Sequence, residues 1–456
     1  MRNRGDKVSG LTMALIGGGS RNWVRVLMKD LALEEQLSGN VRLYDLDYQA
    51  AHENELIGNS LNSYAETKAI WKYKAVRTME DVLTGADFVV ISILPGTFAE
   101  MESDVHLPEE YGIYQSVGDS TGPGGMVRAL RAVPMFTEFA ENIKRYSPDA
   151  WVINYSNPMS VCTRALYETY PEVKAFGCCH EVFASQKLLA AMLKEMKGID
   201  AARQDIKVNV LGINHFTWIN KATYNGIDLW PLYSKFVDKY YEEGYGDWKT
   251  SPFATANRVK FDLFKRYGLM AAAGDRHLAE FCPPWYLKSP DVVEKWKFNL
   301  TPVSWRKNDL QEKIALSNRL VKGEERVNIK ASGEEGVKQI KAILGLGDFV
   351  TNVNLPNIGQ IRGLPLGAVV ETNAVFSTDS VRPVMAGELP PDVHNLVIRN
   401  VINQETILKA AIKKDINLAF KAFANDPLMT AGISDAWELL RRMLENTRDY
   451  LPGWKL

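Results

Sequence analysis

The stretch LTMALIGGGS, residues 11–20, is an apolar run that ends in three glycines and a serine. An amphipathic, helix-like segment begins shortly after it, at Trp23, so the glycines stand between a predicted strand and a predicted helix. In that position glycine N–H groups can approach a pyrophosphate at the positive end of the helix. The stretch therefore predicts the first βα unit of a dinucleotide-binding sheet.

The strand that follows supports this prediction. It reads VRLYD at residues 41–45 and ends in Asp45, where a carboxylate accepts hydrogen bonds from a ribose diol and repels the 2′-phosphate of NADP. The full GxGxxG pattern is not met, because Asn22 occupies the position of the third glycine, and a tight turn beside a solvated acid is the ordinary alternative. Strand, glycines, helix and acid in this order favour NAD. The predicted cofactor-binding residues of this turn are Gly17, Gly18, Gly19, Ser20 and Asp45.

Short apolar runs alternate with helical patterns through the first half of the chain. The runs at residues 86–94 and 151–154 are continuously apolar, as expected for strands that helices cover on both faces, and a further strand is predicted at 173–177. The fold class predicted is α/β, with a Rossmann-like, doubly wound and mostly parallel sheet. We expect this NAD-binding domain to span residues 1–212.

The second half has a different texture, with many aromatic residues at irregular spacing. Short alternating runs at residues 347–376 predict small antiparallel strands that return to the cleft, and helical patterns follow at 390–424 and 435–451. We therefore expect an α+β domain over residues 213–456, which carries the substrate and metal sites and the contacts of a homodimer or homotetramer.

Composition excludes several partners. The chain of 456 residues is 46% hydrophobic and 24% charged, enough for two joined cores, and its net charge of −1 supplies no basic surface for nucleic acid or an anionic membrane. No apolar run approaches the roughly 18 residues of a spanning helix. Four cysteines, two of them adjacent at Cys178 and Cys179, suit a reducing compartment. We expect a cytoplasmic protein.

Polar residues gather where three successive segments end: NYSNP (154–158), GCCHEV (177–182) and GINHF (212–216). The carboxyl ends of strands in a doubly wound sheet line its ligand crevice. Cys179 and His215 are good metal donors, although a lone thiol or imidazole is more often an ordinary buried group. Thiolate and imidazole alone would favour zinc or iron. The amides of Asn157 and Asn214 are suited to orient a sugar hydroxyl or the nicotinamide.

Two further clusters combine glycine with charge. The first, at residues 117–131, reads VGDSTGPGGMVRALR and contains Asp119 and Arg128. Its length is typical of a loop that covers a substrate. The alternative is a plain surface loop with solvated arginines, and for Arg131 we favour that alternative. GDRHLAEF, residues 274–281, is either a helix start with capping charges or the source of a base and an anion clamp.

With these motifs in order, the chain resembles glycoside hydrolase family 4, the NAD- and metal-dependent glycosidases. The resemblance extends over nearly the whole chain and includes GGGS, LYD, GPGG, NxxNP, a CH pair, GxNH, YGxMxxxGD and NxxLPNxGxIxGLP. It implies the architecture of lactate and malate dehydrogenases. It also implies that Cys179 and His215 hold a divalent ion, usually manganese, and that Asn157 contacts both substrate and cofactor.

The mechanism that the resemblance implies is redox-neutral. NAD takes a hydride from C3, the resulting ketone acidifies C2, a base removes the C2 proton, the leaving group is eliminated, water adds and the hydride returns. In relatives the base is a Tyr or an Asp. Asp275 is the predicted base here, and Tyr267 is the second choice.

The subgroup follows from the residues after the metal-binding cysteine. Cys179-His180-Glu181-Val182 is similar to the α-galacturonidase type, whose substrate carries a carboxylate that calls for an arginine. Three roles are open for Glu181: it contacts a substrate hydroxyl, it orients a neighbouring residue, or it serves as the acid that protonates the leaving group. The predicted substrate-binding residues are Asn157, His180, Asn214, Asp119, Arg128 and Arg276, with Arg276 the first choice for the carboxylate.

Other activities remain open at this point. Within the family they are α-galactosidase, α-glucuronidase and 6-phospho-α-glucosidase. Outside it, the main alternative is an NAD-dependent dehydrogenase of the malate or lactate type, which needs a histidine paired with a carboxylate and no metal. A protein that senses NAD without catalysis would leave Cys179, His215 and Asp275 unexplained.

Overall fold

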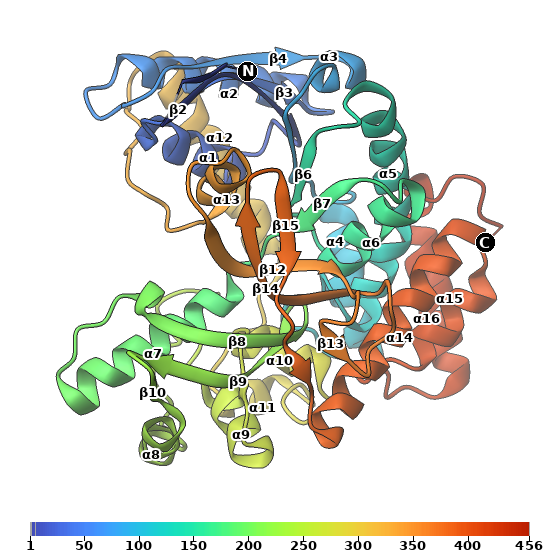
Figure 1. Cartoon of the computed structure of the whole chain (residues 1–456). Coiled ribbons are helices and arrows are strands. Elements are labelled where there is room, and N and C mark those ends of the chain that lie inside the picture. Colours follow the sequence, from blue (N-terminus) through green and yellow to red (C-terminus); the bar gives the residue numbers. More distant parts are fainter. Residues whose placement is uncertain (1, 5, 456) are drawn as a thin grey trace.

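The main sheet is 10-stranded and mostly parallel (Figure 1). The computed structural model describes residues 2–4 and 6–455. The parallel strands lie in the order β4-β3-β2-β5-β6-β7, which is the order of the dinucleotide-binding fold. Their bounds are β2 Lys7–Ile16, β3 Leu37–Tyr44, β4 Trp71–Val76, β5 Phe88–Ile91, β6 Trp151–Asn154 and β7 Lys174–Gly177. The short strand β1, Arg2–Arg4, pairs antiparallel with β2.

Helices cover both faces of this sheet, as the apolar runs predicted. Along β2, Met13 and Leu15 pack into one core cluster, whereas Ala14 and Ile16 pack into the other. The helices of this half are α1 Trp23–Leu33, α2 Tyr48–Ser60, α3 Met79–Leu83, α4 Phe98–His106, α5 Gly122–Tyr146, α6 Met159–Thr169 and α7 Glu181–Lys197. The predicted α/β class is confirmed.

Strands from the second half of the chain extend the same sheet. β12, Phe349–Pro356, pairs antiparallel with β7, and β14, Val369–Ser377, and β15, Ser380–Pro383, follow it outward. Figure 1 shows these orange strands beside β7 near the centre of the molecule. The antiparallel strands predicted within residues 347–376 therefore exist, and they extend the Rossmann-like sheet.

A second, antiparallel sheet lies below the first (Figure 1). It consists of β8 Ile206–Ile213, β9 Phe216–Tyr224, β10 Ile227–Asp228 and β11 Met270–Ala271. The helices of this region are α8 Trp230–Tyr240, α9 Arg258–Tyr267, α10 Asp275–Phe281 and α11 Pro290–Lys295. The next two helices, α12 Val303–Lys322 and α13 Gly336–Ile343, lie instead against α2 and α1, respectively, of the first half (Figure 1). The chain ends in α14 Pro391–Lys413, α15 Ile416–Ala424 and α16 Ile433–Asn446, after a small pair of β13 Ile361–Arg362 and β16 Gly387–Glu388.

The division of the chain at residue 212 stays a prediction. Residue 212 lies inside β8, and strands encoded after it take part in both sheets, so the two halves share their cores. The strand β4 was not predicted. In its WKYKAV sequence, buried residues alternate with the exposed lysines Lys72 and Lys74, and charged lysines are typical of an edge strand such as β4.

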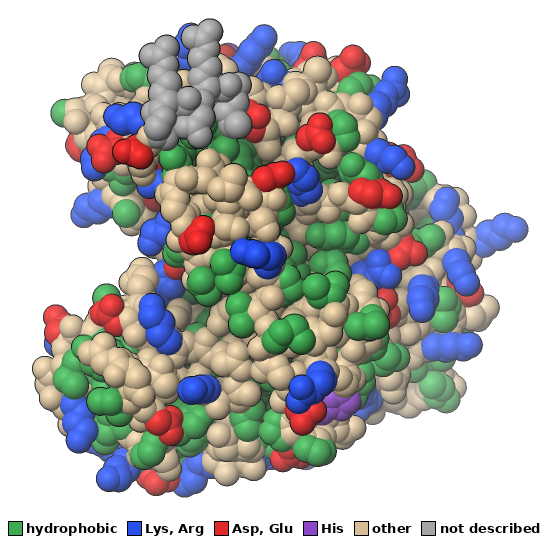
Figure 2. Space-filling view, in the orientation of Figure 1, with side chains coloured by type: hydrophobic (Ala, Val, Ile, Leu, Met, Phe, Trp, Pro, Cys, Tyr) green, Lys and Arg blue, Asp and Glu red, His purple; other side chains and the backbone are tan. Residues whose placement is uncertain are grey.

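On the face that Figure 2 shows, positive and negative side chains are mixed. Figure 2 also shows a notch between the elements of the first sheet and those of the second. Within the described residues, no helix is both long enough and apolar enough to cross a membrane.

Candidate active site

A cavity of about 270 Å³ lies at the carboxyl edge of the main sheet, between that sheet and the elements of the second one. The predicted site residues that line it are Asp119, Asn157, Cys179, His180, Glu181, His215 and Arg276. Side chains that were not predicted as site residues also line it, among them Trp23, Phe253, Thr255, His277 and Arg306. The segments that the sequence placed at successive strand ends therefore do meet.

The glycine turn lies between β2 and α1, as predicted. Gly17 has a φ of 92°, and a Cβ there would stand 2.0 Å from the Ser92 carbonyl oxygen, so only glycine fits. The Asp45 carboxylate accepts hydrogen bonds from the N–H groups of Gly19, at 2.8 Å, and Asp47, at 3.0 Å. Ser20 Oγ accepts the N–H of Trp23, the first residue of α1, at 3.2 Å. The geometry fits a dinucleotide, whose binding by these residues stays a prediction.

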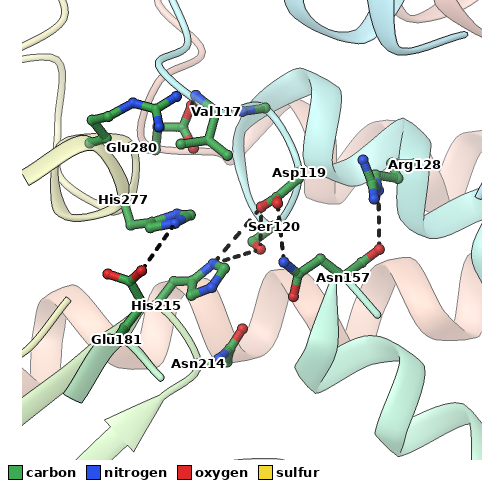
Figure 3. Close-up of polar contacts among 12 residues, drawn as sticks. Val117, Asp119, Ser120, Arg128, Asn157, Glu181, Asn214, His215, His277 and Glu280 are labelled. Carbon is green, nitrogen blue, oxygen red and sulfur yellow. Dashed lines mark hydrogen bonds and ion pairs between the residues drawn. The ribbon is translucent and has the colours of Figure 1, made fainter. Parts of the chain in front are cut away.

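A carboxylate and two imidazoles meet in the cavity (Figure 3). One ligand atom each of Asp119, His215 and His277 lies within 4.8 Å of the others. Asp119 comes from the loop before α5, His215 from the turn between β8 and β9, and His277 from α10. The imidazole rings of His215 and His277 are stacked with their centroids 3.7 Å apart. This cluster has the composition of a divalent metal site.

The neighbours of His215 hold it in place. Ser120 Oγ lies 3.0 Å from His215 Nδ1 and donates to Asp119 Oδ1 at 2.7 Å. His215 has a φ of 64°, a left-handed conformation that costs a residue other than glycine roughly 1–3 kcal/mol. Such cost is typical of functional positions, where the surrounding structure compensates for it.

Burial keeps both imidazoles neutral. It lowers the pKa of His277 to about 3, with a further contribution from His215, and burial also lowers the pKa of His215. A neutral imidazole is the form that binds a metal ion. The side chains present therefore fit a divalent ion, and a mixed oxygen and nitrogen donor set accepts manganese more readily than thiolate and imidazole alone.

Cys179 lines the same cavity beside this cluster but is not one of its three members. Burial raises the pKa of its thiol well above the ordinary value, and the nearby carboxylate of Glu371 adds to the effect. Asn352 donates to the Cys179 carbonyl oxygen at 3.2 Å and to Glu371, and Asn214 donates to Glu371 at 3.4 Å. The prediction that Cys179 and His215 hold the metal stays a prediction, with Asp119 and His277 as additional ligands.

Glu181 opens α7 and projects into the cavity. Its Oε2 accepts the N–H of Gly274 at 2.7 Å, while its Oε1 lies 3.9 Å from His277 Nε2. Burial raises the pKa of Glu181, whereas the Gly274 N–H lowers it, as do the imidazoles of His277 and His215 when they are protonated; the net effect is a pKa below the ordinary value. Glu181 is therefore an ionised acid beside the candidate metal ligands.

The other two predicted catalytic residues lie elsewhere. Asp275 is fully buried and turns away from the cavity, and its Oδ1 accepts the N–H of Lys260 at the start of α9. Tyr267 packs edge-on against Trp218, with ring centroids 5.9 Å apart. Neither lines the cavity, so their placement does not support the role of base.

The arginines considered in the sequence also differ in whether they reach the cavity. Arg128 is buried and donates to the Asn157 carbonyl oxygen at 3.0 Å, behind the cavity wall. Arg131 is buried as well and forms a bidentate ion pair with Asp104, so the preferred interpretation of a solvated surface arginine is wrong. Arg276 lines the cavity.

The loop that carries Asp119 is fastened to α10. Glu280, which lies beside Val117 in Figure 3, accepts hydrogen bonds from the N–H groups of Val117, at 2.7 Å, and Gly118, at 2.9 Å. Arg276 donates to the Ser116 carbonyl oxygen at 2.5 Å. One short helix thus carries His277 and also sets the position of Asp119.

His180 and Asn157 complete the wall toward the nucleotide turn. The ring of His180 stacks on Trp23, at a centroid distance of 5.7 Å, and its Nδ1 lies 3.3 Å from Glu334. Asn157 donates to Asp119 at 3.1 Å, and its buried Oδ1 has no hydrogen-bond partner among the described residues. An unpaired buried acceptor at the sheet edge fits the expectation that a ligand binds there.

A Rossmann-like sheet whose carboxyl edge faces a carboxylate and two neutral imidazoles defines an α/β protein of the dinucleotide-binding class with a cluster of metal-ligating side chains. Models of the family 4 glycosyl hydrolases match this chain over residues 12–195, and those of the family's C-terminal domain match it over residues 210–429. The chain belongs to glycosyl hydrolase family 4. The predicted family is confirmed.

Individual relatives agree with this assignment. The chain is 60% identical to an alpha-galacturonidase of Thermoanaerobacterium saccharolyticum over the full length of both proteins. A crystal structure of the lplD protein of Bacillus subtilis is 54% identical and has a TM-score of 0.92, over 96% of this chain and 100% of that one. A 6-phospho-alpha-glucosidase from gut microorganisms, solved with NAD and Mn²⁺, is 18% identical and shares the fold, with a TM-score of 0.79 over 98% and 100% of the two chains.

Proposed function

We propose that this chain hydrolyses α-D-galacturonides, with NAD and a divalent metal ion, preferably manganese, as cofactors. The observation that carries the proposal is the identity of 60% over the full length of a relative named alpha-galacturonidase. The CHEV sequence at residues 179–182, which favoured the same substrate, lies in the cavity wall and supports it.

The protein's own residues supply the binding and proton transfer that such a reaction needs. Asp119, His215 and His277, with Cys179 beside them, are placed to hold a divalent ion. When bound, the ion stabilises negative charge on the substrate oxygens and NAD accepts and returns a hydride. Asn157, between Asp119 and the nucleotide turn, orients substrate and nicotinamide.

We assign the C2 base to Glu181. Of the three predicted catalytic residues it alone lines the cavity, and its low pKa makes it a carboxylate at neutral pH. The Gly274 N–H fixes one carboxylate oxygen and leaves the other free to accept a proton. A group that takes a proton must be unprotonated before the reaction, and the ionised carboxylate of Glu181 meets this requirement.

The activity is tested with 4-nitrophenyl α-D-galacturonide in the presence of NAD, Mn²⁺ and a reductant, each omitted in turn. We expect release of 4-nitrophenol that needs all three, and slower or no release from the α-glucuronide, α-galactoside and 6-phospho-glucoside. In D₂O the product should carry deuterium at C2. Release without NAD or without deuterium incorporation contradicts the proposal, and NADH formation from a hydroxy acid instead indicates a dehydrogenase.

The role of Glu181 is tested with Glu181→Gln, and with Glu294→Gln on the exposed surface of α11 as the matched control. The nitrophenolate leaving group needs no acid, so only loss of a base slows its release. We expect kcat/KM to fall about 10²- to 10⁴-fold in Glu181→Gln. If Glu181→Gln hydrolyses the nitrophenyl substrate at the normal rate but is slow on a substrate with a sugar leaving group, Glu181 is the leaving-group acid.

That the protein is a homodimer or homotetramer in the cytoplasm remains a prediction.

A further inference from the structure

We infer that Arg306 binds the carboxylate of the uronide substrate and is the residue that selects uronides over neutral sugars. The inference rests on the proposed function and extends it, because the sequence pointed to Arg276 for this role.

Arg306 lies in the first turn of α12 and lines the cavity. That turn is anchored on α4. The Val303 N–H donates to His106 Nε2 at 3.1 Å, and Lys307 pairs with Glu102. Because its helix is fixed at this end, the Arg306 side chain reaches the cavity from a rigid base.

The two cavity arginines differ in what they already bind. Arg276 donates from Nε to the Asn299 carbonyl oxygen, at 3.2 Å, and from Nη2 to Thr301 Oγ1, at 2.7 Å, and to the Ser116 carbonyl oxygen. The side chain of Arg306, by contrast, forms no hydrogen bond or ion pair with any residue in the described ranges. Arg276 holds the protein together, whereas the donors of Arg306 are free for a ligand.

The charges in the cavity also favour a positively charged side chain as the partner of the substrate carboxylate. Asp119 and Glu181 already place two carboxylates in the wall, and a divalent ion at the cluster balances them. A uronide brings a third carboxylate, which is repelled unless it meets a positive group of its own. A guanidinium offers parallel N–H donors that match both oxygens of a carboxylate.

An aromatic ring directs Arg306 toward the ligand. Phe253 lies against both guanidinium groups, with its ring centroid 5.6 Å from Arg306 Cζ and 5.2 Å from Arg276 Cζ. The ring of Trp305 packs edge-on against that of Phe253, at a centroid distance of 5.1 Å. The contact with Phe253 limits the directions open to a long side chain and favours the one into the cavity.

The test compares Arg306→Gln with Arg319→Gln, an exposed arginine on the same helix that pairs only with Glu325. The readouts are kcat/KM for nitrophenyl α-galacturonide and α-galactoside, and calorimetric binding of D-galacturonate and D-galactose. Loss of a charged hydrogen-bonding partner should lower the galacturonide-to-galactoside ratio about 10- to 150-fold, mainly through KM. Arg306→Lys should recover part of the loss, and Arg319→Gln should behave as the unsubstituted protein.

Two results overturn the inference. One is an equal fall for both sugars in Arg306→Gln, which indicates a structural role. The other is retention of galacturonate binding by Arg306→Gln while Arg276→Gln loses it. The binding arm needs no turnover, so selective loss of galacturonate binding supports Arg306 even if hydrolysis of galacturonides, and with it the proposed function, is not observed.

Discussion

Replacing Glu280 by alanine should weaken both the fold and the candidate metal site. Glu280 is fully buried, and its carboxyl group accepts the N–H groups of Val117 and Gly118, next to Asp119. Removing it leaves two buried donors unsatisfied, at about 1–3 kcal/mol each, so the free energy of unfolding should fall by about 2–6 kcal/mol. Because Asp119 loses its support, Mn²⁺ affinity should fall about 10- to 100-fold.

Glu280→Gln separates the acceptor from the charge. Burial raises the pKa of Glu280 to about 8, so the group is largely neutral at pH 7 and an amide replaces it closely. Urea unfolding should place Glu280→Gln within about 1 kcal/mol of the unsubstituted protein. Mn²⁺ binding is followed by the electron paramagnetic resonance of the free ion, with the exposed Glu294→Ala as control. Unchanged unfolding and Mn²⁺ affinity in Glu280→Ala would refute the reasoning.

Three further substitutions probe separate features. Arg131→Met should lower the free energy of unfolding by about 3–5 kcal/mol, because it leaves Asp104 buried and unpaired; adding Asp104→Leu should recover most of it in the same urea assay. Burial raises the pKa of Asp426 to about 6, so the native state binds the extra proton, and stability is lost as the pH rises through the window from about 4 to 6. The unfolding free energy relative to Asp426→Asn should fall by up to about 3 kcal/mol across it, and equal pH profiles would contradict this. Because the Glu371 carboxylate adds to burial in raising the pKa of the Cys179 thiol, Glu371→Gln should make the thiolate easier to form and raise Mn²⁺ affinity about 3- to 10-fold, whereas an unchanged affinity would place the thiol outside the candidate metal site.

Local sequence was sufficient for the nucleotide-binding half. The glycine turn at residues 17–19 and Asp45 follow strands whose apolar runs are long and continuous, so period and order identify them. The polar strand ends at Asn157 and Cys179 meet because the parallel strands β6 and β7 end at one edge. His215 reaches the same cavity from the turn between β8 and β9 of the antiparallel sheet, an origin that the strand-end argument did not predict. These inferences needed only the neighbours of each residue along the chain.

The roles of the 274–281 cluster depended on helix geometry. On α10, Asp275 and His277 point about 200° apart, so one faces α9 when the other faces the cavity. His277 and Glu280 are three residues apart and share a face, a spacing that could have singled out His277. Arg306 had no comparable signal, because its place in the cavity depends on how α12 crosses α4, far away in the sequence.

The pairing of β7 with β12 also has a consequence during synthesis on the ribosome. When Gly177 emerges, the edge of its sheet is open, and β12, the strand that covers it, ends only at Pro356, roughly 180 residues later. At about 5–20 residues per second, the nascent chain exposes this edge for roughly 9–36 s. An unpaired strand edge invites association with other chains, so the growing polypeptide should depend on chaperones in this interval, and a fragment cut after β8 should aggregate.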